Sequence, residues 1–192
     1  MEIITNFLYD YGYIALFITM ALENMNIPIP SEIILGFAGF LISQQIFTFW
    51  PTIIIATIAG ITGSLLSYWM GYKGGRAILL KYGDKGGLSS KKLAAADAWF
   101  TKYGGISVFT GRLLPGIRTF ISLPAGIARY PLPEFILLTV VGTVPWTILL
   151  VYLGALFGEN WQVILDYHYE IAIGSVLLVL LILAGYLYLK KR

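Results

Sequence analysis

Three stretches of this sequence are long enough to cross a lipid bilayer and contain no Asp, Glu, Lys or Arg: residues 33–72, 135–158 and 171–189. A segment that spans a bilayer must satisfy its own backbone hydrogen bonds, and this requirement favours helices. The composition agrees, because 58% of the residues are hydrophobic and only 12% are charged, which is too apolar for an ordinary soluble domain. We therefore expect an all-α integral membrane protein in which residues 1–192 form a single membrane domain.

Two shorter apolar runs lie near the N-terminus, at residues 11–22 and 33–42. Neither would cross a bilayer at the helical rise of ~1.5 Å per residue. The segment between them contains Pro28 and Pro30, which remove backbone donors and push the preceding residues toward extended geometry. This pattern predicts a re-entrant helical hairpin whose polar break lies within the membrane.

The same pattern returns in the second half of the chain, where Pro115 and Gly116 interrupt another pair of short apolar runs. Repetition of a hairpin followed by a full span indicates an internal duplication, with the two copies inserted in opposite orientations. The expected order is repeat one at 11–72, a basic and amphipathic linker at 73–103, repeat two at 104–158, and an extra C-terminal transmembrane helix at 171–189.

The basic residues are unevenly distributed. No Lys or Arg precedes Lys73, seven occur between Lys73 and Lys102, and three more, Lys190, Lys191 and Arg192, end the chain. Because cytoplasmic loops of membrane proteins are enriched in Lys and Arg, we expect the linker and the C-terminus to be cytoplasmic in a multi-pass protein of the cell membrane. The clusters are therefore a topology signal, and we expect no nucleic-acid partner.

Four ionisable residues, Glu23, Glu32, Arg112 and Arg118, stand in or beside the two breaks. A charge at membrane depth costs about 2.5 to 3.5 kcal/mol on translocon scales, so its presence needs an explanation. One interpretation is mutual neutralisation by structural salt bridges between the two hairpins. The other is a polar site for an anionic head group and for protons, and the two interpretations can both hold.

The residue types favour particular roles within such a site. Arginine offers a planar fork of donors that matches a phosphate group and stays charged at any working pH, so we expect Arg112 and Arg118 to bind a substrate phosphate. Glu23 and Glu32, removed from water, should take up protons more readily than exposed carboxylates do. We expect these two residues to couple transport to protons.

Enzymatic motifs are missing from the sequence. It contains no HExxH, GxSxG or Walker A motif and no cysteine, and its one histidine, His168, falls in an expected exterior loop. We therefore expect no catalytic residue, no metal site, no cofactor and no enzymatic activity.

Two GxxxG pairs, Gly71 with Gly75 and Gly154 with Gly158, favour close helix packing. Such pairs serve packing within one chain more often than a dimer interface, and a homodimer stays open as an alternative. Trp146, inside the expected second span, is interpreted as a packing residue.

Three motifs resemble the DedA family of membrane proteins, which is also described as bearing a VTT or SNARE-associated domain. They are Glu23 followed by PIPSE, the stretch from Gly60 to Gly71 with Tyr68, and the run FTGRLLPGIRTFISLPAG at 109–126. The resemblance implies a lipid transporter driven by the proton motive force, with functional residues that map onto Glu23, Glu32, Arg112 and Arg118. Some members have aspartate at the position of Glu32, which leaves the coupling role of that residue open.

The resemblance also bears on the substrate. Bacterial members are associated with recycling undecaprenyl phosphate, others with phosphatidylethanolamine, and eukaryotic relatives with phospholipid scrambling. We accordingly expect a proton-coupled flippase for undecaprenyl phosphate across the cytoplasmic membrane. The alternatives are a phosphatidylethanolamine or phospholipid flippase or scramblase, a small-ion or proton exchanger, and a scaffold in which the four charges are purely structural.

Overall fold

The computed structural model describes residues 2–75, 90–114 and 116–167, with a few isolated positions between 170 and 181. All regular secondary structure in these residues is helical, which confirms the expected all-α class. Pro115, His168 and most of the expected C-terminal helix at 171–189 lie outside the described residues.

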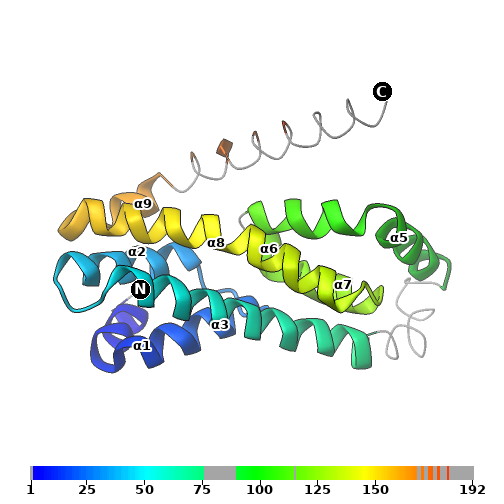
Figure 1. The fold of residues 1–192 in the computed structure, drawn as a ribbon, viewed down its shortest axis with the longest axis horizontal. Helices are drawn as coiled ribbons and strands as arrows, with labels where there is room; N and C mark the ends of the chain where they lie inside the picture. Colours follow the sequence, from blue (N-terminus) through cyan, green and yellow to red (C-terminus); the bar gives the residue numbers. More distant parts are fainter. Residues whose placement is uncertain are drawn as a thin grey trace.

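Three helices of the described chain are long and apolar enough to cross a membrane. They are α1 (Glu2–Asn24), α3 (Phe49–Trp69), which continues into the π-helix η1 (Met70–Gly75), and α8 (Leu132–Phe157), which continues into the short 3-10 helix η2 (Gly158–Asn160). Helix α3 lies within the uncharged stretch at 33–72, and α8 covers nearly all of the one at 135–158. Pro145 lies inside α8, and the ribbon of this helix changes direction along its length (Figure 1).

Helix α1 is longer than the apolar run at 11–22 because it begins at Glu2. Gly12, however, has φ 58° and ψ −132°, a non-helical conformation inside α1. Glycine adopts positive φ without the steric cost that a side chain would add. The apolar run that was expected to begin at residue 11 therefore forms the part of α1 that follows a kink at Gly12.

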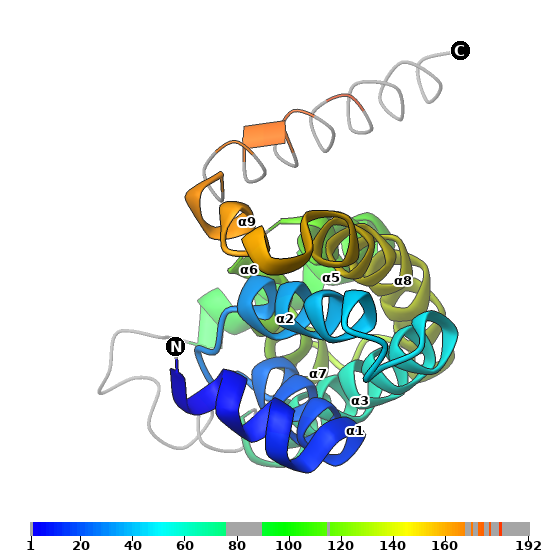
Figure 2. The ribbon, with the colours of Figure 1, turned by 90° about the vertical axis from the view of Figure 1, so that its left-hand side faces the viewer.

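The shorter helices complete the fold. Helix α2 (Ser31–Ser43) lies between α1 and α8 (Figure 2). Helix α5 (Ser90–Leu113) runs without interruption from the expected linker into the expected second repeat. Next come α6 (Ile117–Phe120) and α7 (Ser122–Ile127), and α9 (Val163–Asp166) follows α8.

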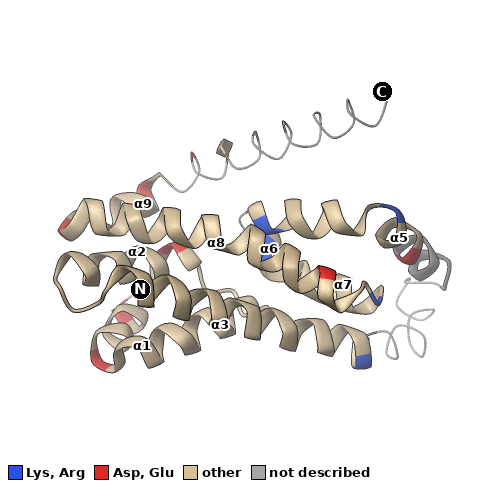
Figure 3. Ribbon diagram, in the orientation of Figure 1, with Lys and Arg blue, Asp and Glu red and all other residues tan. Residues whose placement is uncertain are grey.

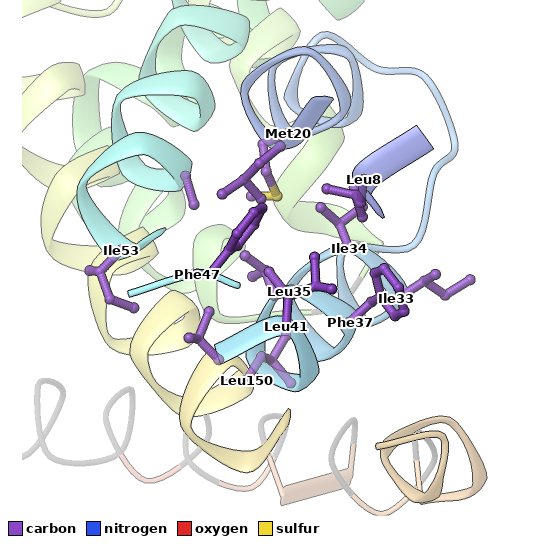
Figure 4. Packing of buried hydrophobic residues seen from close by; sticks show 14 of the residues in the cluster. Leu8, Met20, Ile33, Ile34, Leu35, Phe37, Leu41, Phe47, Ile53 and Leu150 are labelled. Carbon is purple, nitrogen blue, oxygen red and sulfur yellow. The ribbon is translucent and has the colours of Figure 1, made fainter. Parts of the chain in front are cut away.

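Two apolar clusters hold these helices together. The larger cluster joins α1, α2, α3 and α8, and Figure 4 shows Met20, Leu41 and Leu150 among its members. The smaller cluster joins the end of α3 to α5, α7 and the start of α8. Its buried members are Tyr68, Phe100, Val108, Ala125, Tyr130 and Phe135.

The outward faces of the long helices are apolar as well. Ile54 and Ile58 on α3 and Leu137 and Val141 on α8 are exposed. A helix that is hydrophobic on both its packed and its outward faces is suited to a lipid environment.

Glycines allow two close helix crossings. A Cβ added at Gly39 of α2 would lie 2.3 Å from the carbonyl oxygen of Val151 and 2.7 Å from the Cα of Gly154, both on α8. A Cβ added at Gly126 of α7 would lie 2.0 Å from the carbonyl oxygen of Tyr68 on α3. We call these contacts the glycine crossings. In each, a short helix from one half of the chain packs against the long helix of the other half.

The glycine crossings predict a sharp difference between two alanine substitutions. Gly39→Ala places a methyl group against α8 backbone that cannot move aside as a side chain could, and we expect a loss of about 1 to 3 kcal/mol or more. Gly74→Ala is the matched control, because nothing lies within 4 Å of a Cβ at that position. Thermal melting of the two purified variants in detergent checks this. Equal melting temperatures would contradict the close α2–α8 crossing.

Candidate functional site

The breaks that interrupt the two halves of the chain lie against each other. Asn26, in the first break, donates from Nδ2 to the carbonyl oxygen of Thr119 at 3.2 Å. Its Oδ1 accepts a hydrogen bond from the hydroxyl of Ser67 on α3. Asn26 has φ 75°, a conformation that asparagine tolerates better than most residues. One amide therefore ties the first break to both α6 and α3.

Three of the four predicted charges come together at this contact. Glu23 near the end of α1, Arg112 at the end of α5 and Arg118 in α6 are only 1%, 2% and 3% exposed. Nε of Arg118 lies 3.7 Å from Oε1 of Glu23, and this ion pair joins the first half of the chain to the second. The neutralisation expected from the sequence is therefore present, although it is incomplete, because two arginines face one fully buried carboxylate.

Arg112 is bound on several sides by the protein itself. Its Nη1 donates to the carbonyl oxygen of Arg118 at 2.9 Å and to Oδ1 of Asn24 at 3.4 Å. Its Nη2 donates to the hydroxyl of Ser122 at 2.7 Å, and its guanidinium carbon lies 5.6 Å from the ring centre of Phe135. Both terminal nitrogens of Arg112 are therefore already engaged.

Arg118 is held differently. Its Nε faces Glu23, whereas its buried Nη1 and Nη2 have no hydrogen-bond partner among the residues that the structure describes. Its guanidinium carbon lies 5.5 Å from the ring centre of Trp146 on α8, within the range of a cation–π contact. Arg118 therefore presents two donors that can bind an acceptor from outside the protein.

Asn24 connects the charges to one another. Its Nδ2 donates to Oε2 of Glu23 and to the carbonyl oxygen of Met20, the latter at 2.9 Å, while its Oδ1 accepts from Arg112. The carboxylate and the first arginine are therefore linked through one amide, although the direct ion pair goes to Arg118.

The fourth predicted charge, Glu32, occupies a different environment. It lies half-buried in the first turn of α2, and the Ser31 hydroxyl is 3.5 Å from its Oε2. It is near enough to Glu23 for the two carboxylates to repel each other. Glu32 therefore stands beside the buried group rather than inside it.

The predicted break residues lie where the helices start. Pro30 is extended, with φ −66° and ψ 118°, immediately before α2, and Pro28 is exposed. Gly116 precedes α6 with φ 77°. Both are backbone conformations that a continuing helix could not adopt.

Several residues of this site were not predicted. Asn24 and Asn26 flank Glu23 and the first break, and Ser122 follows the second. The argument used for charges would have found the asparagines, since an amide at membrane depth also needs partners. Trp146 was interpreted as packing alone, and nothing in the sequence placed its ring on Arg118.

The donor set indicates the kind of ligand that the site can take. Guanidinium nitrogens are donors only, so the free positions on Arg118 fit an anion and repel a cation. Among the described residues, no three His, Cys, Asp or Glu side chains gather in a group that could hold a metal ion. The two unpaired nitrogens of Arg118 therefore have the chemistry to donate to an anion such as a phosphate or a carboxylate.

Comparison with known proteins gives close relatives over the full chain. Undecaprenyl phosphate transporter A of Bacillus subtilis (strain 168) is 37% identical over 191 residues, which cover 100% of this chain and 94% of the relative. The protein of the same name in Staphylococcus aureus (strain NCTC 8325 / PS 47) is 34% identical over 197 residues, covering 100% and 97%. An alkaline phosphatase-like protein of Lactococcus lactis subsp. cremoris (strain MG1363) is 37% identical over 199 residues, covering 100% and 92%.

No solved structure matches this chain. The family model for the VTT domain matches residues 29–156, a range that includes both glycine crossings and both buried arginines. Together with three helices of spanning character, these matches support a transporter role in a multi-pass protein of the cell membrane. The chain belongs to the VTT-domain family, the DedA family to which its motifs pointed.

Proposed function

We propose that this protein is a flippase that carries undecaprenyl phosphate across the cytoplasmic membrane. The observation that carries the proposal is the buried excess of positive charge, in which Arg118 keeps two donors without a protein acceptor. A phosphate oxygen would satisfy those donors with charge-assisted hydrogen bonds. The names of two full-length relatives specify the same lipid phosphate.

The two arginines then have different tasks. Arg118 binds the phosphate directly. Arg112, whose terminal nitrogens already bond to the Arg118 backbone, Asn24 and Ser122, holds the second break in place and adds positive charge to the site. It binds the phosphate itself only when one of those partners is exchanged for the lipid.

Glu23 competes with the lipid for Arg118. While Glu23 is ionised, its carboxylate pairs with Nε of Arg118 at 3.7 Å. Protonation removes that charge and leaves two buried arginines without a carboxylate partner, which favours entry of the phosphate. Glu32, half-buried beside Glu23, receives and passes the proton. Lipid uptake is thereby coupled to proton uptake.

The proposal includes two inverted repeats, each made of a re-entrant hairpin and a span. Support comes from the glycine crossings, which use corresponding residues: Ala38-Gly39 of α2 packs on α8, and Ala125-Gly126 of α7 packs on α3. The described Lys and Arg positions gather in the half of the molecule that holds α5, α6 and α7 (Figure 3). We propose that this end and the C-terminus are cytoplasmic.

Transport assays test the proposal directly. In proteoliposomes, wild-type protein should move labelled undecaprenyl phosphate between leaflets, and Arg118→Met should slow this movement at least ~10-fold, because charge-assisted hydrogen bonds to the phosphate are lost. Arg129→Met is the matched control, since Arg129 lies on the ring of Tyr72 and not in the site, and it should leave the rate within about twofold of wild type.

Three other outcomes of that assay are informative. Movement of phosphatidylethanolamine in place of undecaprenyl phosphate would change the lipid and keep the site. Proton or sodium flux without lipid movement would replace the proposal with an ion exchanger. Release of inorganic phosphate would replace it with the activity that the name of the Lactococcus relative suggests.

A stability comparison separates the two arginines. Arg112→Met leaves the Arg118 carbonyl, Asn24 and Ser122 without their donor, and we expect a loss of about 3 kcal/mol. Arg118→Met removes one ion pair and no protein hydrogen bond, so its loss should be smaller. Thermal melting of both variants in the same detergent is the measurement. A larger loss of stability for Arg118→Met than for Arg112→Met would mean that Arg118 holds the second break and Arg112 binds the phosphate.

The pH dependence tests Glu23. As pH falls, protonation of Glu23 should free Arg118 and raise the affinity of wild-type protein for farnesyl phosphate, a short isoprenoid phosphate. Glu23→Gln should bind tightly at every pH tested and keep only the dependence that comes from the phosphate itself. Asp10→Asn, a change at an exposed residue of α1, should behave as wild type. Identical pH profiles for wild type and Glu23→Gln would exclude Glu23 as the coupling group.

A further inference from the structure

Trp146 is buried against the arginine that the proposed function assigns to phosphate binding. Its side chain is 6% exposed, and its ring centre lies 5.5 Å from the guanidinium carbon of Arg118. It stands on α8 directly after Pro145, while Arg118 belongs to α6. The contact therefore joins two elements that are distant in sequence.

The indole nitrogen of Trp146 is unsatisfied. Nε1 is buried and, within the described part of the chain, has no hydrogen-bond partner. An indole N–H is a donor only, and buried donors are rarely left without an acceptor because the desolvation cost is not recovered. This unsatisfied donor belongs to the ring on which the Arg118 guanidinium lies.

The two side chains in contact therefore carry three buried donor atoms without a partner: Nη1 and Nη2 of Arg118 and Nε1 of Trp146. They come from two helices, and no described acceptor bonds to any of them. A neutral apolar group would leave all three donors unsatisfied. An oxyanion with several acceptor oxygens, such as a phosphate, suits all three at once.

We propose that Trp146 is a phosphate-binding residue, in which the indole N–H donates to one phosphate oxygen while the guanidinium of Arg118 donates to the others. The indole ring also fixes the guanidinium through the cation–π contact, so that both donors stay oriented in the absence of ligand. This inference rests on the proposed function, because it takes Arg118 as the phosphate contact.

Replacing Trp146 by phenylalanine tests the hydrogen bond while keeping an aromatic ring on Arg118. With protein in nanodiscs, Trp146→Phe should bind farnesyl phosphate about tenfold more weakly than wild type, which corresponds to one hydrogen bond to a charged group. Farnesol, which lacks the phosphate, should bind both proteins equally. Trp50→Phe is the matched control, because Trp50 is exposed on α3, and it should bind as wild type.

A second measurement keeps the test valid if Trp146→Phe is unstable. In wild-type protein labelled with 5-fluorotryptophan, the 19F resonance assigned to Trp146 should shift on addition of farnesyl phosphate and stay in place with farnesol. A shift with inorganic phosphate as well would support the indole contact and identify the phosphate group alone as sufficient. Equal shifts with farnesyl phosphate and farnesol would overturn the proposal.

The variants also separate this inference from the proposed function. If Trp146→Phe binds farnesyl phosphate as wild type does while Arg118→Met loses binding, Trp146 is a packing residue and the proposed function stands. If Arg118→Met also binds as wild type does, both proposals fail. Loss in both variants, with Trp50→Phe unaffected, supports both.

Discussion

Two guanidinium groups are buried beside one carboxylate, and the surrounding residues of the site must compensate their charge. Taking a charge out of water is costly unless it is paired and hydrogen-bonded. The protein meets most of this cost at Arg112, through the Arg118 carbonyl, Asn24 and Ser122. It leaves the requirement partly unmet at Arg118, where Nη1 and Nη2 lack partners. At Arg112 both terminal nitrogens are bonded and only the buried Nε lacks a partner among the described residues, whereas at Arg118 both terminal nitrogens lack one.

Helix α8 connects this site to the packing of the molecule. Phe135 lies against Arg112 and Trp146 lies against Arg118. Gly142 makes room for the Arg112 side chain, since a Cβ there would come within 2.6 Å of it. Farther along the same helix, Gly154 supports the crossing with α2. Pro145 lies directly before Trp146 in α8, where it removes one helical hydrogen bond. Helix α8 therefore contacts both arginines of the site and also packs against α2.

The sequence predicted the features that depend on composition and on strong local signals. The uncharged stretches located α3 and α8, and Pro30 and Gly116 marked the starts of α2 and α6. Glu23, Arg112 and Arg118 were identified because charge at membrane depth is costly. The kink at Gly12 was not predictable, because glycine is compatible with helix and turn alike.

Contacts between residues that are far apart in the chain could not be predicted from a single sequence. Arg118 pairs with Glu23, whereas Arg112 bonds to backbone and amide groups. This difference depends on how α5 and α6 approach α1. Two arginines six positions apart across a break have the same chemistry in the sequence, and only tertiary packing distinguishes them. The position of Trp146 on Arg118 has the same origin.

At the glycine crossings each short helix packs on the long helix of the other half of the chain. This arrangement affects the order in which the chain folds as it is synthesised. Helix α2 emerges early, but the backbone surface against which Gly36 and Gly39 pack belongs to α8. Until α8 has been made, the tight face of α2 has no native partner, and the first half cannot complete its own core. Assembly of the N-terminal half must therefore wait for the C-terminal half, so that this small protein folds as one unit rather than as two successive ones.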